Sequence, residues 1–432
     1  MSRAAADQPI PGLFAFHDDE ARRLAEQHGT PLFAYHAPTA RRCYRRLRAA
    51  LPDRLRIAYA VKSNPHRELL AALAGMGASF DCASEGELRR VMELGLPAGR
   101  VFFAGPGKRA AELRLALDAG ARVQAEGWED LERLDALASV PLVVNLRIHP
   151  IGGVEEDRHI LGGVGPSAFG IDEEDLDEIL ERARGLDRVR IRGVHVFAAT
   201  NQRSVDKLLA TYAMVFGIAR RVADAIGGNS LEQIDLGGGL GVAYGPEQPG
   251  LDIFALGDGL TEFLAANPWF GGEVILEPGR LLSAPCGVYL ARVVRIKQSR
   301  GVTFAILEGG INHLMRPFLT GEAFPVRAVG KSPQPRSDNQ RGAEVMTASV
   351  PRDPGTGEEI DTHPRGRASK TDTVPYTLAG PLCTSLDRLG DVDLPGLAAG
   401  DLLAFGTAGG YGFTEGMTHF LSHPVPPEIW VE

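Results

Sequence analysis

The chain has 432 residues, of which 23% are charged, and a formal net charge of −9 at pH 7. That length exceeds one typical domain and predicts a second. The excess of negative charge gives no reason to expect a nucleic-acid partner, and no run approaches the ~18 apolar residues that a membrane helix needs. Four cysteines, without a signal-like apolar segment at the start, predict a reducing cytoplasm and argue against a disulfide framework.

Eight short apolar runs occur before residue 280, and each is followed by turn residues and a helical pattern. They cover residues 56–61, 79–82, 101–104, 122–125, 142–148, 190–196, 233–236 and 273–276. Eight strands that alternate with helices over about 250 residues are typical of a (β/α)8 barrel. The sequence therefore predicts an α/β fold whose active site lies at the carboxyl ends of these strands.

Lys62 stands at the end of the first run, in Tyr59-Ala-Val-Lys-Ser-Asn-Pro65. An amine at the end of a buried strand is partly desolvated, which lowers its pKa and prepares it to form a Schiff base with an aldehyde cofactor. A lone lysine at such a position is more often a solvated side chain at a strand edge. The functional interpretation therefore depends on other residues that converge on the same end of the barrel.

Two later segments provide that convergence. Gly237-Gly-Gly239 follows the seventh run, and Glu277-Pro-Gly-Arg280 follows the eighth. Glycines let backbone N–H groups approach phosphate oxygens, and barrels often bind phosphate in the loops after strands seven and eight. Arg280 would add a charge-assisted hydrogen bond, and Glu277 needs a cationic partner such as a protonated pyridine nitrogen. An aldehyde-reactive lysine, a phosphate cradle and this carboxylate together indicate pyridoxal phosphate.

Ten ordered stretches then carry a family resemblance that covers nearly the whole chain. They are residues 59–65, 80–84, 145–147, 169–171, 193–195, 237–239, 277–280, 316–317, 380–383 and 410–411. In these stretches the chain resembles the fold-type III pyridoxal-phosphate decarboxylases, which include diaminopimelate, ornithine and arginine decarboxylases. The resemblance implies an alanine racemase-like fold, with a (β/α)8 TIM-like barrel and a C-terminal β domain.

By this resemblance, Lys62 would carry the cofactor and Glu277 would keep its pyridine nitrogen protonated. Cys383 would protonate the substrate carbon after carbon dioxide leaves. It would come from the partner subunit of an obligate homodimer with shared active sites. The other residues implied to surround the cofactor are Asp81, Arg147, His195, Phe197, Thr200, Gly237, Gly238, Gly239, Gly279, Arg280 and Tyr411. No metal ion is expected.

The predicted domain organisation has three parts. Residues 1–31 form an N-terminal segment, residues 32–280 the barrel and residues 281–432 the β domain. The resemblance implies that Leu13 to Phe16 add a strand to the β domain. Residues 331–373 are rich in Pro, Gly, Arg, Asp and Ser, which predicts a flexible insertion. This insertion is interpreted either as a passive linker or as a lid over the substrate.

Departures from the family pattern bear on the substrate. Phe197 stands where diaminopimelate decarboxylases carry a histidine that stacks on the cofactor ring, and a phenyl ring can stack but cannot protonate. Thr384 follows Cys383 where relatives that act on basic amino acids place an acidic residue for the distal ammonium. Thr320 replaces a tyrosine that is usual in the diaminopimelate enzymes. Free lysine, ornithine and diaminopimelate are therefore disfavoured as substrates.

The pattern Cys383-Thr-Ser-Leu-Asp387, with Phe420-Leu-Ser-His-Pro424, is similar to that of a branch of the family that works in secondary metabolism. The enzymes of this branch act on citryl-diamino acid conjugates or on carrier-tethered aminoacyl groups. The leading hypothesis is decarboxylation of such a conjugated or tethered amino acid. The substrate-contacting residues would be Arg316, Thr384 and Asn201, although an ordinary ion pair at a domain boundary explains Arg316 about equally well. The alternatives are decarboxylation of a free diamino acid and a catalytically silent homologue. A racemase would need a second base, and no tyrosine candidate is evident.

Overall fold

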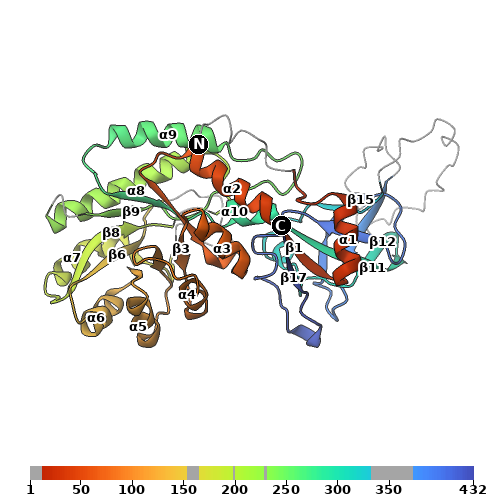
Figure 1. Ribbon diagram of the computed structural model, residues 1–432, viewed down its shortest axis with the longest axis horizontal. Helices are drawn as coiled ribbons and strands as arrows, with labels where there is room; N and C mark the ends of the chain where they lie inside the picture. Colours follow the sequence, from red (N-terminus) through yellow and green to blue (C-terminus); the bar gives the residue numbers. More distant parts are fainter. Residues whose placement is uncertain (1–11, 153–164, 198–199, 228–230, 332–372) are drawn as a thin grey trace, which may run out of the picture.

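The computed structural model of the protein describes residues 12–152, 165–197, 200–227, 231–331 and 373–432 (Figure 1). The predicted insertion at residues 331–373 lies outside the described residues, apart from its two end positions. Two separate β-sheets divide the described chain into a barrel and a β domain. Within the described ranges, none of the helices combines the length and the apolar character that are needed to cross a lipid bilayer.

The first sheet is a closed parallel barrel, as the sequence predicts. Its eight strands are β2 (Leu55–Ala60), β3 (Ser79–Cys82), β4 (Val101–Phe103), β5 (Arg122–Ala125), β6 (Leu142–His149), β8 (Val189–His195), β9 (Gln233–Asp235) and β10 (Glu273–Leu276). Pairing of β10 with β2 and of β5 with β6 closes the ring. The short strand β7 (Ile171–Asp172) pairs with β6 outside the ring. The observed strands differ from the predicted runs only at their end residues.

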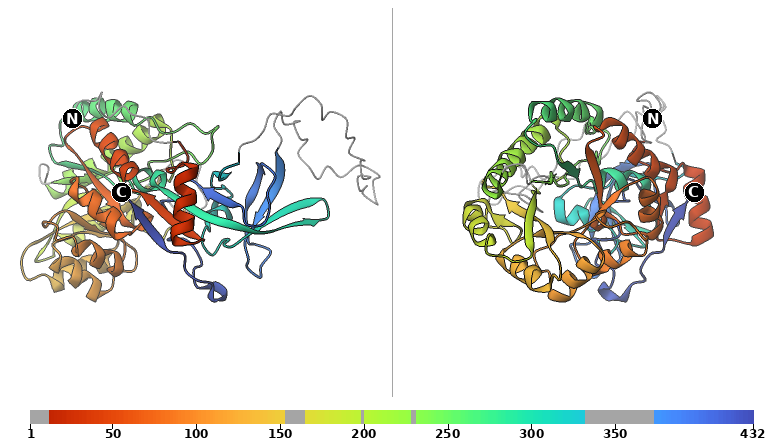
Figure 2. Two further views of the ribbon diagram at one scale, coloured as in Figure 1. Left: turned by 45° about the vertical axis from the view of Figure 1, so that its right-hand side comes forward. Right: turned by 60° about the vertical axis from the view of Figure 1, so that its left-hand side comes forward.

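Helices surround this barrel as an outer ring, which the right-hand view of Figure 2 shows end-on. They are α2 (Ala37–Ala50), α3 (Arg67–Gly75), α4 (Glu85–Met92), α5 (Ala110–Asp118), α6 (Trp128–Leu137), α7 (Leu176–Ala183), α8 (Val205–Ile226) and α9 (Ile253–Ala266). Each buries one apolar stripe: in α7, Leu176, Ile179 and Leu180 are buried at the i, i+3, i+4 spacing of one helix face. Rigid strands and helices thus hold the loops at the carboxyl end of the barrel.

The second sheet combines strands from both ends of the chain. They are β1 (Leu32–His36), β11 (Gly287–Ser299), β12 (Val302–Leu307), β13 (Val326–Ala328), β14 (Val374–Ala379), β15 (Arg388–Leu394), β16 (Leu402–Phe405) and β17 (Glu428–Val431). Three further helices accompany this part of the chain: α1 (Asp18–His28), α10 (Arg280–Ser283) and α11 (Arg316–Thr320). The predicted C-terminal β domain is confirmed.

The N-terminal contribution to this sheet differs from the prediction. Residues 13–16 form no strand, and the strand from this part of the chain is β1 instead. It lies between β11, to which it is antiparallel, and β17, to which it is parallel. Leu32 to Tyr35 are completely buried, because a strand between two others and under a helix has no exposed face. The barrel sheet therefore begins at Leu55, and residues 32–36, assigned to the barrel from the sequence, belong to the second sheet.

A buried polar network stabilises the β domain around His313. The Asn312 amide nitrogen lies 3.1 Å from His313 Nε2, and Nδ1 lies 2.8 Å from the Tyr289 hydroxyl. Since the amide donates to Nε2, the folded protein holds the imidazole neutral. Burial lowers the pKa of His313 to about 4.

We expect the free energy of unfolding to fall by about 2–3 kcal/mol through His313 as the pH decreases from about 6.5 to about 4. The unfolded chain binds this proton near pH 6.5 and the folded chain only near pH 4, so acid favours unfolding across that window. Urea unfolding at several pH values should show a shallower pH dependence for His313→Gln than for the wild type. His28→Gln, at an exposed histidine, is the control. Equal slopes for His313→Gln and wild type would contradict the assignment.

Candidate active site

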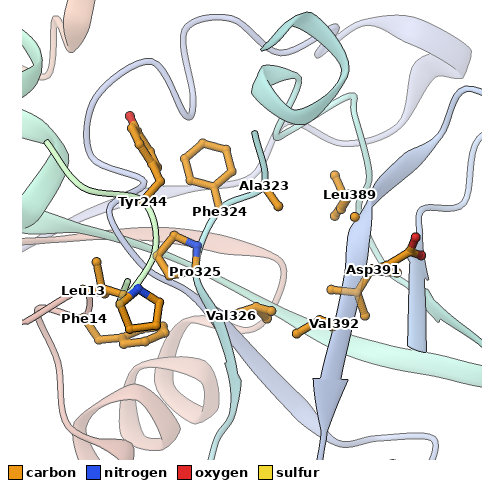
Figure 3. Close-up of a pocket in the computed structure, with 13 residues that line it drawn as sticks. Leu13, Phe14, Tyr244, Ala323, Phe324, Pro325, Val326, Leu389, Asp391 and Val392 are labelled. Atoms are coloured by element: carbon orange, nitrogen blue, oxygen red, sulfur yellow. The ribbon is translucent and has the colours of Figure 1, made fainter. Parts of the chain in front are cut away.

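Cavities lined by described residues lie between the barrel loops and the β domain. The first has a volume of about 420 Å³, and Tyr244 and Phe324 lie side by side in its wall (Figure 3). Its other lining residues are Leu13, Phe14, Pro246, Ala323, Pro325, Val326, Leu378, Leu389, Gly390, Asp391 and Val392. The wall is mostly apolar, Asp391 is its one charged residue, and none of the predicted site residues lines it. We therefore do not place the chemistry there.

The second cavity, of about 400 Å³, contains Lys62 and lies at the carboxyl end of the barrel. Five predicted site residues line it: Lys62, Phe197, Thr200, Arg280 and Tyr411. Four more, which the sequence did not indicate, complete the wall: Pro65, Glu87, Thr414 and Glu415. This volume is typical of a small-molecule or cofactor site. We take this cavity as the candidate active site.

Lys62 lies in the short 3-10 turn that ends β2. Its Nζ stands 4.8 Å from the centroid of the Phe197 ring, within reach of a cation–π interaction. Burial lowers the pKa of Lys62, but the nearby Tyr411, Asp81 and Glu277 raise it more, so the net pKa lies above its usual value. Desolvation thus acts in the predicted direction, but the predicted net lowering of this pKa is wrong, because the acidic groups around the amine outweigh it.

Three buried side chains, which we call the floor, lie near Lys62 but are not among the residues that line the cavity. Asp81, His195 and Glu277 are 4%, 2% and 3% exposed, and His195 Nε2 lies 3.3 Å from Glu277 Oε2. Burial raises the pKa of Glu277, but His195 and other neighbours lower it to about 2, so this carboxylate is ionised. Asp81 Oδ1, Glu277 Oε1 and both nitrogens of His195 make no well-formed hydrogen bond within the described residues. Buried polar atoms of this kind indicate a site that a polar ligand completes.

Asp235 joins this floor, although the sequence analysis did not select it. It ends β9, is fully buried, and each of His195, Asp235 and Glu277 contributes an atom to a group within 4.8 Å. Its oxygens accept the Gly237 N–H at 2.9 Å and the Gln124 amide at 3.3 Å. Because N–H groups outside the trio already donate to both oxygens of Asp235, we do not interpret the trio as a cation site. Asp235 could have been identified from the sequence by its position at the end of a predicted strand, just before the glycine run.

Arg147 is held at the floor by a chain of buried charges. Its Nη1 lies 3.0 Å from Glu126 Oε1, and its guanidinium covers the Phe169 ring at 4.9 Å. Lys108 lies 3.7 Å from Glu126 and 2.8 Å from Asp130. The positive charges of Arg147 and Lys108 thus balance the negative charges of Glu126 and Asp130, and these contacts fix the Arg147 side chain.

The glycine run forms a tight turn that only glycine permits. Gly237 and Gly239 have φ values of +67° and +94°, in the left-handed region that side chains disfavour. A Cβ at Gly238 would lie 2.7 Å from the Glu277 carbonyl and 3.2 Å from the Phe197 ring. The turn thus brings bare backbone next to the ring of Phe197, which lines the cavity, and next to the backbone of Glu277.

Arg280 faces the cavity from the start of α10. Its Nη1 donates to the Tyr244 hydroxyl at 2.6 Å, and the guanidinium covers the Tyr411 ring at 4.5 Å. At Gly279, a Cβ would lie 2.8 Å from the Cβ of Ser63, so glycine allows α10 to approach the Lys62 turn. The structure thus brings one guanidinium, Thr200 and Tyr411 together at the cavity wall.

Two of the predicted substrate residues lie apart from the cavity wall. Arg316 stacks on the Tyr244 ring, with its guanidinium carbon 4.1 Å from the ring centroid, and forms an ion pair with Glu322. Asn201 uses its Oδ1 to accept the Val242 N–H at 2.9 Å, which holds the loop after β8 against the loop after β9. Neither residue lines the cavity that contains Lys62, so their substrate roles stay predictions.

Cys383 lies on an exposed loop before β15 and does not line the Lys62 cavity. The buried Asp387 organises this loop: Oδ1 accepts the Ile311 N–H and Oδ2 accepts the Leu382 N–H, both at 2.8 Å. The Thr384 hydroxyl accepts the Leu386 N–H at 3.2 Å. These hydrogen bonds hold the loop in a fixed conformation, in which the Cys383 thiol is exposed on the surface of this chain.

The sequence profile described as "Pyridoxal-dependent decarboxylase, pyridoxal binding domain" matches residues 39–284. The chain belongs to this decarboxylase family. It is 33% identical over 397 residues to the diaminopimelate decarboxylase of Pseudomonas aeruginosa, across 90% of this chain and 85% of the relative. It is 29% identical over 418 residues to the L-glutamyl-[BtrI acyl-carrier protein] decarboxylase of Niallia circulans, across 95% and 90% of the two chains. The predicted family resemblance is confirmed.

A solved structure supports the fold of this decarboxylase. The diaminopimelate decarboxylase of Helicobacter pylori complexed with L-lysine superimposes with a TM-score of 0.79 at 24% sequence identity, and the match covers 95% of this chain and 94% of that one. The likeness shows that the barrel and β domain of the decarboxylase are shared with that protein.

The site residues fit pyridoxal phosphate, the cofactor of the family. The unpartnered oxygens of Asp81 and Glu277 lie on the floor, and the bare backbone at Gly238 leaves room that a Cβ would fill. Lys62 supplies the amine, and Arg280 the cation for a phosphate. The residues that would hold the cofactor are therefore Lys62, Asp81, Glu277, Arg280, Tyr411 and the turn at Gly237–Gly239.

Proposed function

We propose that this decarboxylase removes the α-carboxylate of an amino acid whose side chain is conjugated or tethered to a carrier protein. When bound, pyridoxal phosphate withdraws electrons from the substrate carbon and so stabilises the charge left by carbon dioxide. The protein's own residues must then hold the cofactor, exclude water and deliver one proton.

The described side chains suit these tasks. Lys62 provides the amine that holds the cofactor, and the ionised Glu277 keeps a pyridine nitrogen protonated on the floor. The Phe197 ring, which covers Lys62 Nζ, offers an apolar face against which an aromatic ring can stack. Cys383 would deliver the proton to the substrate carbon as a general acid.

We infer the substrate class from the Cys383 loop, in which no carboxylate is available to bind the ammonium group of a substrate. Thr384 stands where relatives bind a distal ammonium, and its hydroxyl already accepts the Leu386 N–H. Asp387 cannot replace the missing acid, because it is 3% exposed and both its oxygens accept backbone N–H groups. A substrate with a free terminal ammonium would find no partner on this loop, whereas a conjugated side chain needs none. The relative from Niallia circulans acts on an acyl-carrier-protein substrate, which supports this class.

One feature of the cavity favours a second candidate, decarboxylation of a free diamino acid. Glu415 lines the wall near Lys62, and its Oε2 makes no hydrogen bond within the described residues. Burial raises the pKa of Glu415, and the charges of Arg280 and Arg316 lower it only in part. An ionised Glu415 could bind the ammonium group of a substrate. This requires that Arg280 and Arg316 leave part of its negative charge unbalanced.

Carbon dioxide release across a substrate panel tests the proposal. For the cofactor-loaded enzyme we expect kcat/KM at least about thirty-fold higher for conjugated or carrier-tethered amino acids than for free lysine, ornithine or diaminopimelate, since a missing ion-pair partner costs about 2 kcal/mol or more. Thr384→Glu should raise activity on the free diamino acids, whereas Ser385→Glu, its matched control, should not.

The same panel separates the alternatives. Rapid release from a free diamino acid that Glu415→Gln abolishes would establish the second candidate and overturn the first. Silence across the whole panel by protein that holds its cofactor would instead indicate a catalytically silent homologue.

We also propose that the protein acts as a homodimer with shared active sites. Cys383 is exposed and does not line the cavity of its own chain. Exposed apolar side chains occur on the Cys383 loop, on α11 and near the C-terminus, namely Leu386, Phe318, Leu319, Phe420 and Leu421. An apolar surface around an outward-facing acid is what a partner subunit would cover. The four cysteines are all free thiols, which supports the expected cytoplasmic location.

A further inference from the structure

The barrel floor contains one carboxyl group more than the proposed function uses. Glu277 is assigned to the pyridine nitrogen, yet Asp235 lies beside it, and both are at most 3% exposed. Two adjacent buried carboxyl groups cannot both ionise without a large electrostatic cost. One of them must therefore keep a proton.

The surroundings of the two groups decide which one keeps it. Glu277 has His195 Nε2 at 3.3 Å and the charge of Lys62 nearby. Among the described residues, the hydrogen bonds that Asp235 accepts come from neutral groups, the Gly237 N–H and the Gln124 amide. Burial and the charge of Glu277 raise the pKa of Asp235 well above its usual range. The proton is therefore assigned to Asp235, whose carboxyl group lies within 4.8 Å of the Glu277 carboxylate and can donate toward it.

Backbone hydrogen bonds close this contact into a ring. Asp235 Oδ1 accepts the Gly237 N–H at 2.9 Å, and the Gly237 carbonyl accepts the Glu277 N–H at 2.8 Å. A hydrogen bond from Asp235 to Glu277, whose carboxyl groups lie within 4.8 Å of each other, would complete the circuit. The glycine turn and the floor carboxylate, which serve opposite ends of the cofactor, are thus parts of one hydrogen-bonded unit.

We propose that Asp235 is a positioning residue that stays protonated, donates its hydrogen bond to Glu277 and fixes that carboxylate relative to the glycine turn. The role rests on the proposed contact of Glu277 with the cofactor. Asp235 does not touch the reacting atoms; it keeps Glu277 ionised and oriented, and it limits how the turn at Gly237 can move.

Two substitutions at this position test the proposal. In Asp235→Asn the amide can still donate to Glu277, and its oxygen can still accept the Gly237 N–H. In Asp235→Val, of similar volume, both hydrogen bonds are lost. We expect Asp235→Asn to bind pyridoxal phosphate within about three-fold of the wild type and Asp235→Val to bind it about ten- to a hundred-fold more weakly. Thermal unfolding of both variants shows whether a loss of cofactor binding comes only from a loss of protein stability.

Infrared spectroscopy of the cofactor-free protein gives an independent readout. With 13C-labelled aspartate, the wild type should show the carbonyl stretch of a protonated buried carboxyl group, and Asp235→Asn should lack it. Absence of this band from the wild type would overturn the proposal, as would an Asp235→Asn variant that binds the cofactor as weakly as Asp235→Val. If the wild type bound no pyridoxal phosphate, the proposed function would fail, while the infrared band would still decide where the proton lies.

Discussion

Lys62→Ala should lose the visible absorbance of covalently held cofactor and at least about a thousand-fold of its decarboxylase activity, because the variant lacks the amine that a covalent mechanism requires. The glycine turn and Arg280 remain in place, so the variant should still bind pyridoxal phosphate reversibly. Dialysis should remove the cofactor from Lys62→Ala and leave it on the wild type, and mass spectrometry after borohydride reduction should locate it on Lys62.

Lys297→Ala is the control for this experiment, since Lys297 is an exposed lysine on β11. It should keep both the covalent cofactor and the activity. A Lys62→Ala protein that still held cofactor through dialysis and reduction would show that another amine carries it, and Lys108, the buried lysine paired with Asp130, would then be the first to examine.

Cys383→Ala should keep the cofactor absorbance and lose about a hundred- to ten-thousand-fold in kcat, the range expected for the removal of a general acid. Cofactor affinity should not change, because Cys383 is not among the residues assigned to hold the cofactor. Wild-type turnover by this variant would remove the thiol from the mechanism.

A mixing experiment then tests where Cys383 acts. Equal amounts of Lys62→Ala and Cys383→Ala, dissociated and reassociated, give mixed dimers in which one of the two shared sites contains both wild-type residues. We expect about a quarter of the wild-type activity from random reassortment of a two-fold symmetric dimer. A mixture as inactive as its two components would contradict a shared site.

Local patterns in the sequence were sufficient for the barrel and for most of the cavity wall. Each predicted strand is a short apolar run bounded by turn residues, so its position is a local property of the chain. Lys62, Phe197, Arg280 and the glycine turn then follow, because the carboxyl ends of parallel strands meet at one face of a barrel. The same logic failed at β1, whose partners β11 and β17 lie more than half the chain away and leave no local signal.

What the sequence by itself determined is therefore the family, the barrel and the residue types that gather at its carboxyl end. Only the tertiary structure decided how these groups influence one another. The pKa of Lys62 is raised because Tyr411, Asp81 and Glu277, from three other parts of the chain, outweigh its burial. Asp235 acquires a role only because β9 and β10 bring it beside Glu277. Electrostatic and hydrogen-bond energies depend on distances across the fold, and spacing along the chain does not specify those distances.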